Sequence, residues 1–189
     1  MLRQLATLIL KLSGWKMVGE FPYHVKKCVI VIAPHTSNYD YIIGRLFFFM
    51  INVHVKFLIK KEIFVFPIGG LIRYWGGIPV DRKRNNHMVD YVAEQFSKHE
   101  RLYVVVTPEG TRKLVPHWKR GFYYIALKAK IPLALSFLDY PKKEVGVMEI
   151  FQPSGNYAKD LAYIESLYRD KTGRHPEQFN LYVKRDSIG

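Results

Sequence analysis

The chain has 189 residues, 49% of them hydrophobic, with a formal net charge of +13 and a pI near 9.7. This size allows one domain with a real apolar core, while the absence of any run of ~18 apolar residues excludes a membrane-spanning helix. The single cysteine, Cys28, excludes an internal disulfide and fits a reducing compartment. The charge favours anionic partners such as lipid head groups or nucleic acid, or else marks a solvated basic face.

The N-terminal segment, residues 1–20, predicts an amphipathic helix. Its apolar residues share one face of a helical wheel, and the opposite stripe is polar: Leu2, Leu5, Ala6, Ile9 and Leu12 against Arg3, Gln4, Thr7 and Lys11. Lys11 interrupts a signal-peptide core, and no small-residue cleavage site follows. Such a helix either lies in a membrane interface or packs on its own domain.

The rest of the chain alternates between predicted strands and predicted helices. We expect strands at residues 28–33, 53–59, 78–80, 102–107, 133–138 and 145–151, and helices at 39–51, 86–98, 120–130 and 158–169. This alternation predicts one α/β domain over residues 1–189, with a mostly parallel twisted sheet and helices on both faces. The tail from residue 172 onward is expected to be loosely ordered.

A histidine and a carboxylate follow the first predicted strand, at His35 and Asp40. An imidazole can act as a base near neutral pH, and a carboxylate on its second nitrogen fixes the tautomer and favours the imidazolium. Because a spacing of five lies off one helix face, the two side chains meet only if the chain turns between them. Thr36, Ser37 and Asn38 suit such a turn and can cap the next helix. The alternative is a capping or surface histidine.

A second polar cluster follows the strand predicted at residues 102–107. Gly110 lets the backbone approach a ligand beside Glu109, and Arg112 is a planar cation suited to phosphate or carboxylate. The alternative is a turn in which Glu109 and Arg112 pair with each other. Between the two clusters, Gly-Ile-Pro-Val-Asp-Arg delivers a second arginine, Arg82, or forms a turn with a solvated Asp-Arg pair.

Both clusters follow the carboxyl ends of predicted parallel strands, which is where ligands bind in such sheets. We therefore expect His35 and Glu109 to lie in one site. The seven histidines show no metal-ligand spacing, so no metal is expected. There is no G-x-S-x-G elbow and no P-loop, and the position of Cys28 at the head of a strand indicates packing rather than nucleophilic attack.

Four motifs stand in order within residues 28–140: His-x-x-x-x-Asp, Gly-Ile-Pro-Val-Asp-Arg, Pro-Glu-Gly-Thr-Arg and Ile-Pro-Leu. This ordered set resembles the glycerophospholipid (lysophosphatidate-type) acyltransferase family. The closest similarity is to its small bacterial members, whose cores carry phrases much like Arg-Tyr-Trp-Gly-Gly before the second motif and Trp-Lys-Arg-Gly-Phe-Tyr-Tyr after the third.

The resemblance implies acyl transfer from a thioester, either acyl-CoA or an acyl carrier protein, to a hydroxyl of a lysophospholipid or glycerol-phosphate-type acceptor, without a cofactor. It implies that His35 is the general base and that Asp40 orients it. It also implies an acceptor-binding set: Arg82, Glu109, Gly110, Thr111 and Arg112. The tetrahedral intermediate needs hydrogen-bond donors, for which backbone N–H groups near Gly110 and Thr111 are candidates.

The expected partners are the thioester donor, a lipid acceptor with an anionic head group and an anionic membrane surface. We expect a cytoplasmic protein, peripherally associated with the inner face of the cell membrane. One alternative is a catalytically silent lipid-binding protein of the same fold, against which the intact His35 and Asp40 speak. Another is a basic nucleic-acid-binding protein, which would leave the four motifs without a role and shows no binding motif. Nucleic acid is therefore not an expected partner.

Overall fold

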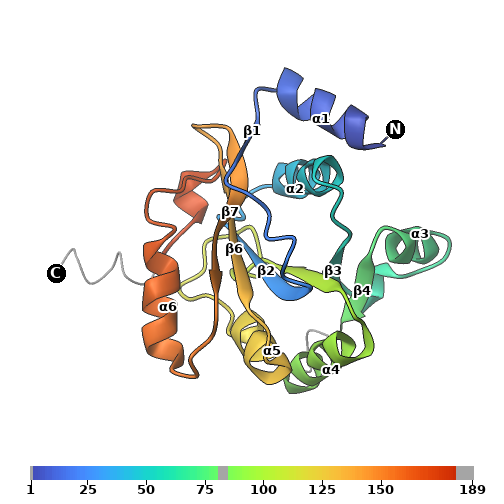
Figure 1. The fold of residues 1–189 in the computed structure, drawn as a ribbon, viewed down its shortest axis with the longest axis vertical. Helices are drawn as coiled ribbons and strands as arrows, with labels where there is room; N and C mark the ends of the chain where they lie inside the picture. Colours follow the sequence, from blue (N-terminus) through green and yellow to red (C-terminus); the bar gives the residue numbers. More distant parts are fainter. Residues whose placement is uncertain (1, 81–84, 182–189) are drawn as a thin grey trace.

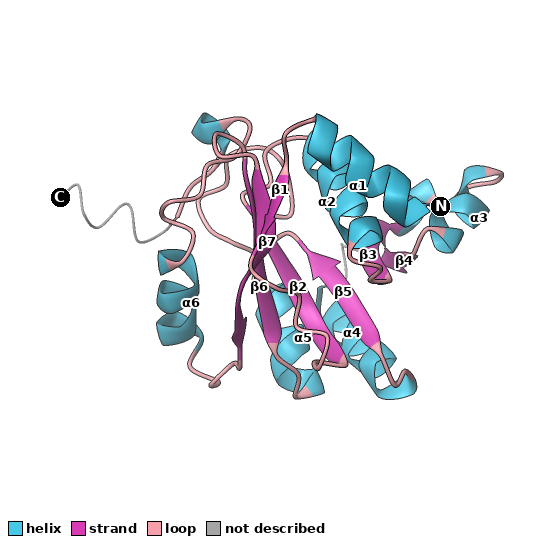
Figure 2. Ribbon diagram, turned by 45° about the horizontal axis from the view of Figure 1, so that its top comes forward, coloured by secondary structure: helices cyan, strands magenta, loops and turns pink. Residues whose placement is uncertain are grey.

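The computed structural model describes residues 2–80 and 85–181, which form a seven-stranded sheet with helices on both faces (Figures 1 and 2). The strand order is β1-β7-β6-β2-β5-β3-β4, and every neighbouring pair is parallel except β6 with β7. The prediction of a mostly parallel α/β sheet is confirmed. The strands are β1 (Lys16–Val18), β2 (Lys27–Ala33), β3 (Val55–Lys60), β4 (Gly77–Val80), β5 (Leu102–Val106), β6 (Leu133–Asp139) and β7 (Glu144–Phe151).

The helices divide between the two faces of the sheet (Figure 1). On one face lie α1 (Leu2–Leu12) and α2 (Tyr39–Met50). On the other lie α4 (Asn85–Lys98), α5 (Gly121–Ala129) and α6 (Tyr157–Ser166). The short helix α3 (Ile68–Tyr74) stands beside the edge strand β4, and 3-10 turns form at Lys61–Ile63 and Pro176–Gln178.

Strand β2 is buried on both sides because its side chains alternate between two apolar clusters. Val29, Val31 and Ala33 pack in the cluster with α4, α5 and α6. Cys28, Ile30 and Ile32 pack in the cluster with α1 and α2. Strands with both faces covered read as continuous apolar runs, as this one does. Its carboxyl end therefore delivers His35 from a fixed position in the middle of the sheet.

Every strand and helix that we predicted is present, with differences only at the ends. Among the described residues, strand β1, helix α3 and the two 3-10 turns were not predicted. Strand β1 has only three residues, too few to show a periodicity in the sequence. It is held in the sheet by parallel pairing with β7. Helix α3 contains Gly69 and Gly70, and glycine has a low intrinsic helix propensity.

The predicted N-terminal helix over residues 1–20 is too long, since α1 ends at Leu12. The Gly14 N–H donates to Lys11 O at 3.0 Å, and the Trp15 N–H donates to Leu10 O at 2.9 Å. Gly14 has φ +80°, the left-handed conformation that closes a helix in this hydrogen-bond pattern. The chain then turns directly into β1.

Helix α1 packs on α2 through only part of its apolar surface. Ala6 and Leu10 are buried, and the Arg3 side chain donates to the Met50 carbonyl at 3.1 Å. The outer apolar residues stay exposed: Leu2, Leu5, Leu8, Ile9 and Leu12. Within residues 2–80 and 85–181, no helix is both long and apolar enough to span a bilayer.

The expectation of a loose C-terminal tail is wrong for residues 172–181, and residues 182–189 lie outside the described part of the chain. Leu181 is buried in the larger apolar cluster. The His175 N–H donates to Thr36 Oγ1 at 3.1 Å, and Gly173 packs against Pro34 and Thr36. The tail was misread because its order comes from contact with the His35 loop, which no local pattern encodes.

Candidate active site

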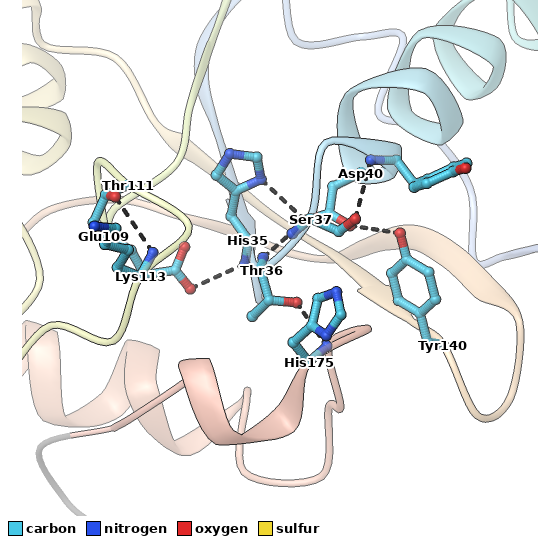
Figure 3. Close-up of polar contacts among 10 residues, drawn as sticks. His35, Thr36, Ser37, Asp40, Glu109, Thr111, Lys113, Tyr140 and His175 are labelled. Atoms are coloured by element: carbon cyan, nitrogen blue, oxygen red, sulfur yellow. Dashed lines mark hydrogen bonds and ion pairs between the residues drawn. The ribbon is translucent and has the colours of Figure 1, made fainter.

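The two predicted catalytic residues meet at the carboxyl end of β2 (Figure 3). The chain leaves β2 at Ala33 and turns through residues 34–38, where Ser37 Oγ accepts the Tyr39 N–H at 3.2 Å as α2 begins. This turn brings His35 Nδ1 to 3.1 Å from Asp40 Oδ2. The expected turn between histidine and aspartate is therefore present.

The Asp40 carboxylate is held by four donors. Its Oδ2 accepts the N–H groups of Thr36 and Ser37, both at 2.8 Å, as well as His35 Nδ1. Its Oδ1 accepts the Tyr140 hydroxyl at 2.5 Å. Because an ionised carboxylate can only accept, Nδ1 of His35 carries a proton, and in the neutral form of the ring Nε2 then has the free lone pair.

Burial and hydrogen bonding act in opposite directions on Asp40. Burial raises the pKa of this carboxyl. Hydrogen bonds from His35, Tyr140 and the Ser37 N–H together lower it by more, so the pKa lies below the ordinary 3.8. Asp40 is therefore ionised at neutral pH, the state that favours an imidazolium on His35. The His35 side chain is 17% exposed and that of Asp40 only 3%, so solvent reaches the pair through the histidine.

Glu109 lies beneath the backbone of His35. The His35 N–H donates to Glu109 Oε1 at 3.0 Å, and the residue is 2% exposed. No side chain or backbone group among the described residues forms a hydrogen bond to Oε2. Burial raises the pKa of Glu109 to about 8, and the charge of Asp40 acts in the same direction. Glu109 is therefore mostly protonated at neutral pH and fixes the His35 backbone; acceptor binding by this residue stays a prediction.

The loop after β5 holds Gly110 in a conformation that requires glycine. Its φ is +68°, and an added Cβ would lie 3.2 Å from Lys119 Cγ. The Gly110 N–H donates to Thr107 O at 3.0 Å, so it closes the turn and is not the free oxyanion donor that we considered.

The other predicted acceptor-binding residues are Thr111, Arg112 and Arg82. Thr111 Oγ1 accepts the Lys113 N–H at 3.3 Å, and Arg112 is exposed on the same loop, while the Glu109 carboxyl group accepts the His35 N–H. Arg82 lies outside the described residues, so the expectation that it joins Arg112 stays a prediction.

Two features of the site were not predicted. Tyr140 follows β6, whose Phe137 pairs with Ala33 of β2, so the hydroxyl reaches Asp40 from the neighbouring strand end. The only signal was a polar residue after a predicted strand. The C-terminal segment adds the Gln178 side chain, whose amide faces the backbone carbonyls of Thr36 and Arg112 and donates to both when its nitrogen is turned toward them. It thereby joins the two motif loops.

Cys28 packs in the core, as expected. Its side chain is fully buried, and burial raises the pKa of the thiol to about 12, which disfavours the nucleophilic thiolate. Within the described residues, no three His, Cys, Asp or Glu side chains gather as a metal site would require.

Comparison with known proteins shows the family of this chain. A family model described as Acyltransferase matches residues 15–134, which is more than half of the chain. The chain belongs to the Acyltransferase family. The predicted family resemblance is thus confirmed, and the His35–Asp40 pair lies within the part that the family model matches.

A solved structure supports the fold of this family member. The crystal structure of the 1-acyl-sn-glycerophosphate (LPA) acyltransferase PlsC from Thermotoga maritima matches 99% of this chain and 78% of its own, with a TM-score of 0.61 and 17% sequence identity. At that identity the likeness shows the fold alone. A search of curated proteins finds no match.

Proposed function

We propose that this protein transfers an acyl group from an acyl thioester to a hydroxyl of a lysophospholipid-type acceptor. The observation that carries the proposal is the contact of 3.1 Å between His35 Nδ1 and the ionised Asp40. Membership of the Acyltransferase family supports it, and the fold is shared with a lysophosphatidate acyltransferase.

In the proposed reaction, His35 Nε2 takes the proton of the acceptor hydroxyl while its oxygen attacks the thioester carbonyl carbon. Asp40 stabilises the imidazolium that results. The carbon–sulfur bond then breaks as the new ester forms, and the imidazolium returns its proton to the leaving thiolate. The acceptor oxygen is the nucleophile, so the reaction needs no acyl-enzyme, which agrees with the burial of Cys28.

For the acceptor, we propose a phosphorylated head group held by the arginines of the second and third motifs, Arg82 and Arg112. A guanidinium can donate two parallel hydrogen bonds to a phosphate, and Arg112 is exposed on the loop that also carries Glu109. Acyl-CoA and an acyl carrier protein are both proposed as donors.

Incubation of the purified protein with both donors and matched phosphorylated and dephosphorylated lysolipids tests this function by mass spectrometry of the products. We expect acylated phospholipid from the parent protein and none above background from His35→Ala. Absence of product with every donor and acceptor, in a folded parent protein, would favour a silent lipid-binding protein instead. Equal use of the dephosphorylated acceptors would remove the arginine assignment alone.

We also propose that the protein docks on an anionic membrane at the inner face of the cell membrane. Apolar side chains are exposed on α1 and over residues 63–75, where Phe66 is 98% and Tyr74 85% exposed. Both segments lie on the side of the molecule away from α5 and α6 (Figures 1 and 2). Exposed Lys61 and Arg73 lie in or beside the second segment and would attract anionic lipid.

Sedimentation with vesicles of neutral or partly anionic lipid tests the docking surface. Leu5→Asp and Phe66→Asp should each weaken binding to the anionic vesicles, and salt should weaken binding of the parent. Tyr91→Asp is the control, because Tyr91 is also an exposed apolar residue but lies on α4, on the opposite face of the sheet. If all three variants bind like the parent, this surface is not the docking site.

A further inference from the structure

Tyr140 contacts the catalytic pair from a distant part of the chain. It is the first residue after β6, and its hydroxyl donates to Asp40 Oδ1 at 2.5 Å across a sequence separation of 100 residues. Figure 3 shows the phenol approaching Asp40 from the side opposite His35. None of the four sequence motifs includes this residue.

The two oxygens of Asp40 have separate partners. Oδ2 faces His35 Nδ1 and the backbone N–H groups of Thr36 and Ser37, whereas the hydrogen bond to Oδ1 comes from Tyr140. Donors on both oxygens fix the rotation of the carboxylate plane about the Cβ–Cγ bond. Without the phenol hydroxyl, Oδ1 would lose that donor in a buried position, which favours rotation toward another partner.

The phenol itself is fixed by two other segments of the chain. The Trp15 ring packs edge-on against the Tyr140 ring, with centroids 5.1 Å apart. The Tyr140 N–H donates to Thr172 O at 2.9 Å. Burial, and then the hydrogen bond to Asp40, raise the pKa of Tyr140 far above its ordinary value, so the hydroxyl stays a donor.

We propose that Tyr140 is a positioning residue of the acyl-transfer reaction, holding the Asp40 carboxylate in the orientation that keeps the proton of His35 on Nδ1. Tyr140 acts through Asp40 and does not touch the substrate. This assignment rests on the proposed function for its kinetic consequence, but the position of the histidine proton can be measured without substrate.

Tyr140→Phe removes the hydroxyl and retains the ring that packs on Trp15. We expect kcat to fall by about tenfold or more, the size of one lost charge-assisted hydrogen bond, while KM for donor and acceptor changes little. In ¹⁵N NMR at a pH where the ring is neutral, His35 of the parent should be protonated at Nδ1, and the variant should show a mixture of tautomers. Tyr140→Leu is a second variant without a donor, should the first not fold.

Two matched controls are available, because among the described residues the hydroxyls of Tyr123 and Tyr163 also donate to carboxylates. Tyr123 donates to the buried Asp160 at 2.7 Å, and the exposed Tyr163 donates to Glu149 at 2.7 Å. Tyr123→Phe and Tyr163→Phe should leave kcat and the His35 tautomer as in the parent, although the former lowers stability. This separates an effect on the catalytic pair from a general effect of losing a tyrosine hydroxyl.

The proposal is overturned if Tyr140→Phe keeps the parent tautomer of His35. It is also overturned if the loss of kcat is no larger than in Tyr123→Phe. Should the folded parent protein acylate no acceptor, the proposed function fails on its own, and the NMR comparison still decides whether Tyr140 sets the histidine proton.

Discussion

Two tyrosine–aspartate pairs, each with a buried aspartate, lie on opposite faces of the sheet, and they differ in the other partners of the aspartate. Tyr140 donates to Asp40 at 2.5 Å on the face of α2, and Tyr123 donates to Asp160 at 2.7 Å between α5 and α6. In both, the carboxylate also accepts backbone N–H groups from the preceding loop: those of Thr36 and Ser37 at Asp40, and that of Ser154 at Asp160.

The remaining partner makes the difference. Asp160 accepts both the N–H and the hydroxyl of Ser154 at 2.7 Å, so these donors and the Tyr123 hydroxyl are neutral groups that do not titrate near neutral pH. Asp40 instead faces His35, a partly exposed ring that can take up a proton. Burial raises the pKa of each carboxyl, but the hydrogen bonds lower it by more, so both pKa values lie below the ordinary 3.8. A tyrosine–aspartate hydrogen bond therefore joins α5 and α6 at Asp160, whereas at Asp40 it belongs to the group that holds the proposed base, His35.

The largest expected effect is the loss of the base. His35→Ala should lower kcat by roughly 10² to 10⁴, the usual range for a positioned general base, while the fold is retained. His99→Ala, a change of an exposed histidine on the far side of the sheet, is the control and should keep parent kinetics. Near-parent turnover by a folded His35→Ala protein would remove the proposed mechanism.

Replacing Asp40 or Asp160 by asparagine should affect catalysis in the first case and stability in the second. In Asp40→Asn, the amide oxygen can still face the Thr36 and Ser37 N–H groups, but the charge that favours the imidazolium is lost, so kcat should fall roughly 10- to 1,000-fold. Asp160→Asn should mainly lower stability, by about 1 to 3 kcal/mol, because an amide N–H₂ faces donors.

Steady-state kinetics and urea unfolding of both asparagine variants check this division. A large loss of kcat in Asp160→Asn at unchanged stability would show that the two pairs are not separate. Parent-like kcat in Asp40→Asn would show that the negative charge beside His35 is not used.

The sheet and the His35–Asp40 pair could be predicted because their signals are local. Residues 28–33 form a continuous apolar run, and residues 34–40 combine capping residues with a histidine and a carboxylate. The family resemblance then supplied the order of the motifs. The buried position of Glu109 could not be read in this way, since it depends on the packing of the loop after β5 under β2.

Tyr140 and the tail were missed for a different reason. Tyr140 reaches Asp40 only because β6 pairs with β2, and a strand order cannot be deduced from periodicity. Likewise, Gly173 and His175 are ordered by contact with Thr36, across a separation of 139 residues in the case of His175. Contacts of this kind are set by tertiary structure, to which local propensity is blind.

Glu109 is another buried carboxyl, and it should respond to pH in the opposite direction from Asp40. Its pKa is about 8 in the folded protein against an ordinary 4.5. As pH rises between these values, the unfolded chain releases the proton and the folded protein keeps it, so the free energy of unfolding falls, by ~1.4 kcal/mol per pKa unit. The stabilising contribution is complete below pH 4.5 and is lost by about pH 8.

Glu109→Gln should remove this pH dependence, because the amide resembles the protonated acid and can still accept the His35 N–H. Urea unfolding at pH 4.5 and pH 8, the two pKa values, should show a smaller difference in stability for the variant than for the parent. Glu94→Gln, at an exposed position on α4, should keep the parent difference. An equal difference in all three proteins would show that Glu109 is ionised in the folded state.

The smallest expected effect concerns Gly173, in the C-terminal segment that packs against the loop between His35 and Asp40. A Cβ on Gly173 would lie 2.7 Å from Thr36 Oγ1 and 3.1 Å from Pro34 Cβ, so Gly173→Ala must displace one of them. Thr36 donates its N–H to Asp40 Oδ2 at 2.8 Å, and a shift of that group should loosen the catalytic carboxylate. We expect kcat to fall only a few-fold, with a loss of stability of about 1 to 3 kcal/mol from overpacking.

Gly44→Ala is the matched control, since a Cβ there meets nothing within 4 Å and alanine favours the helix α2. It should keep or raise the melting temperature and leave kcat unchanged. If Gly173→Ala loses stability but keeps the parent kcat and His35 tautomer, the C-terminal segment supports the fold without affecting Asp40. The Asp40 carboxylate would then be held in place by Tyr140 and the N–H groups of Thr36 and Ser37 alone. The two tyrosine–aspartate pairs would differ only in that Asp40 also contacts His35.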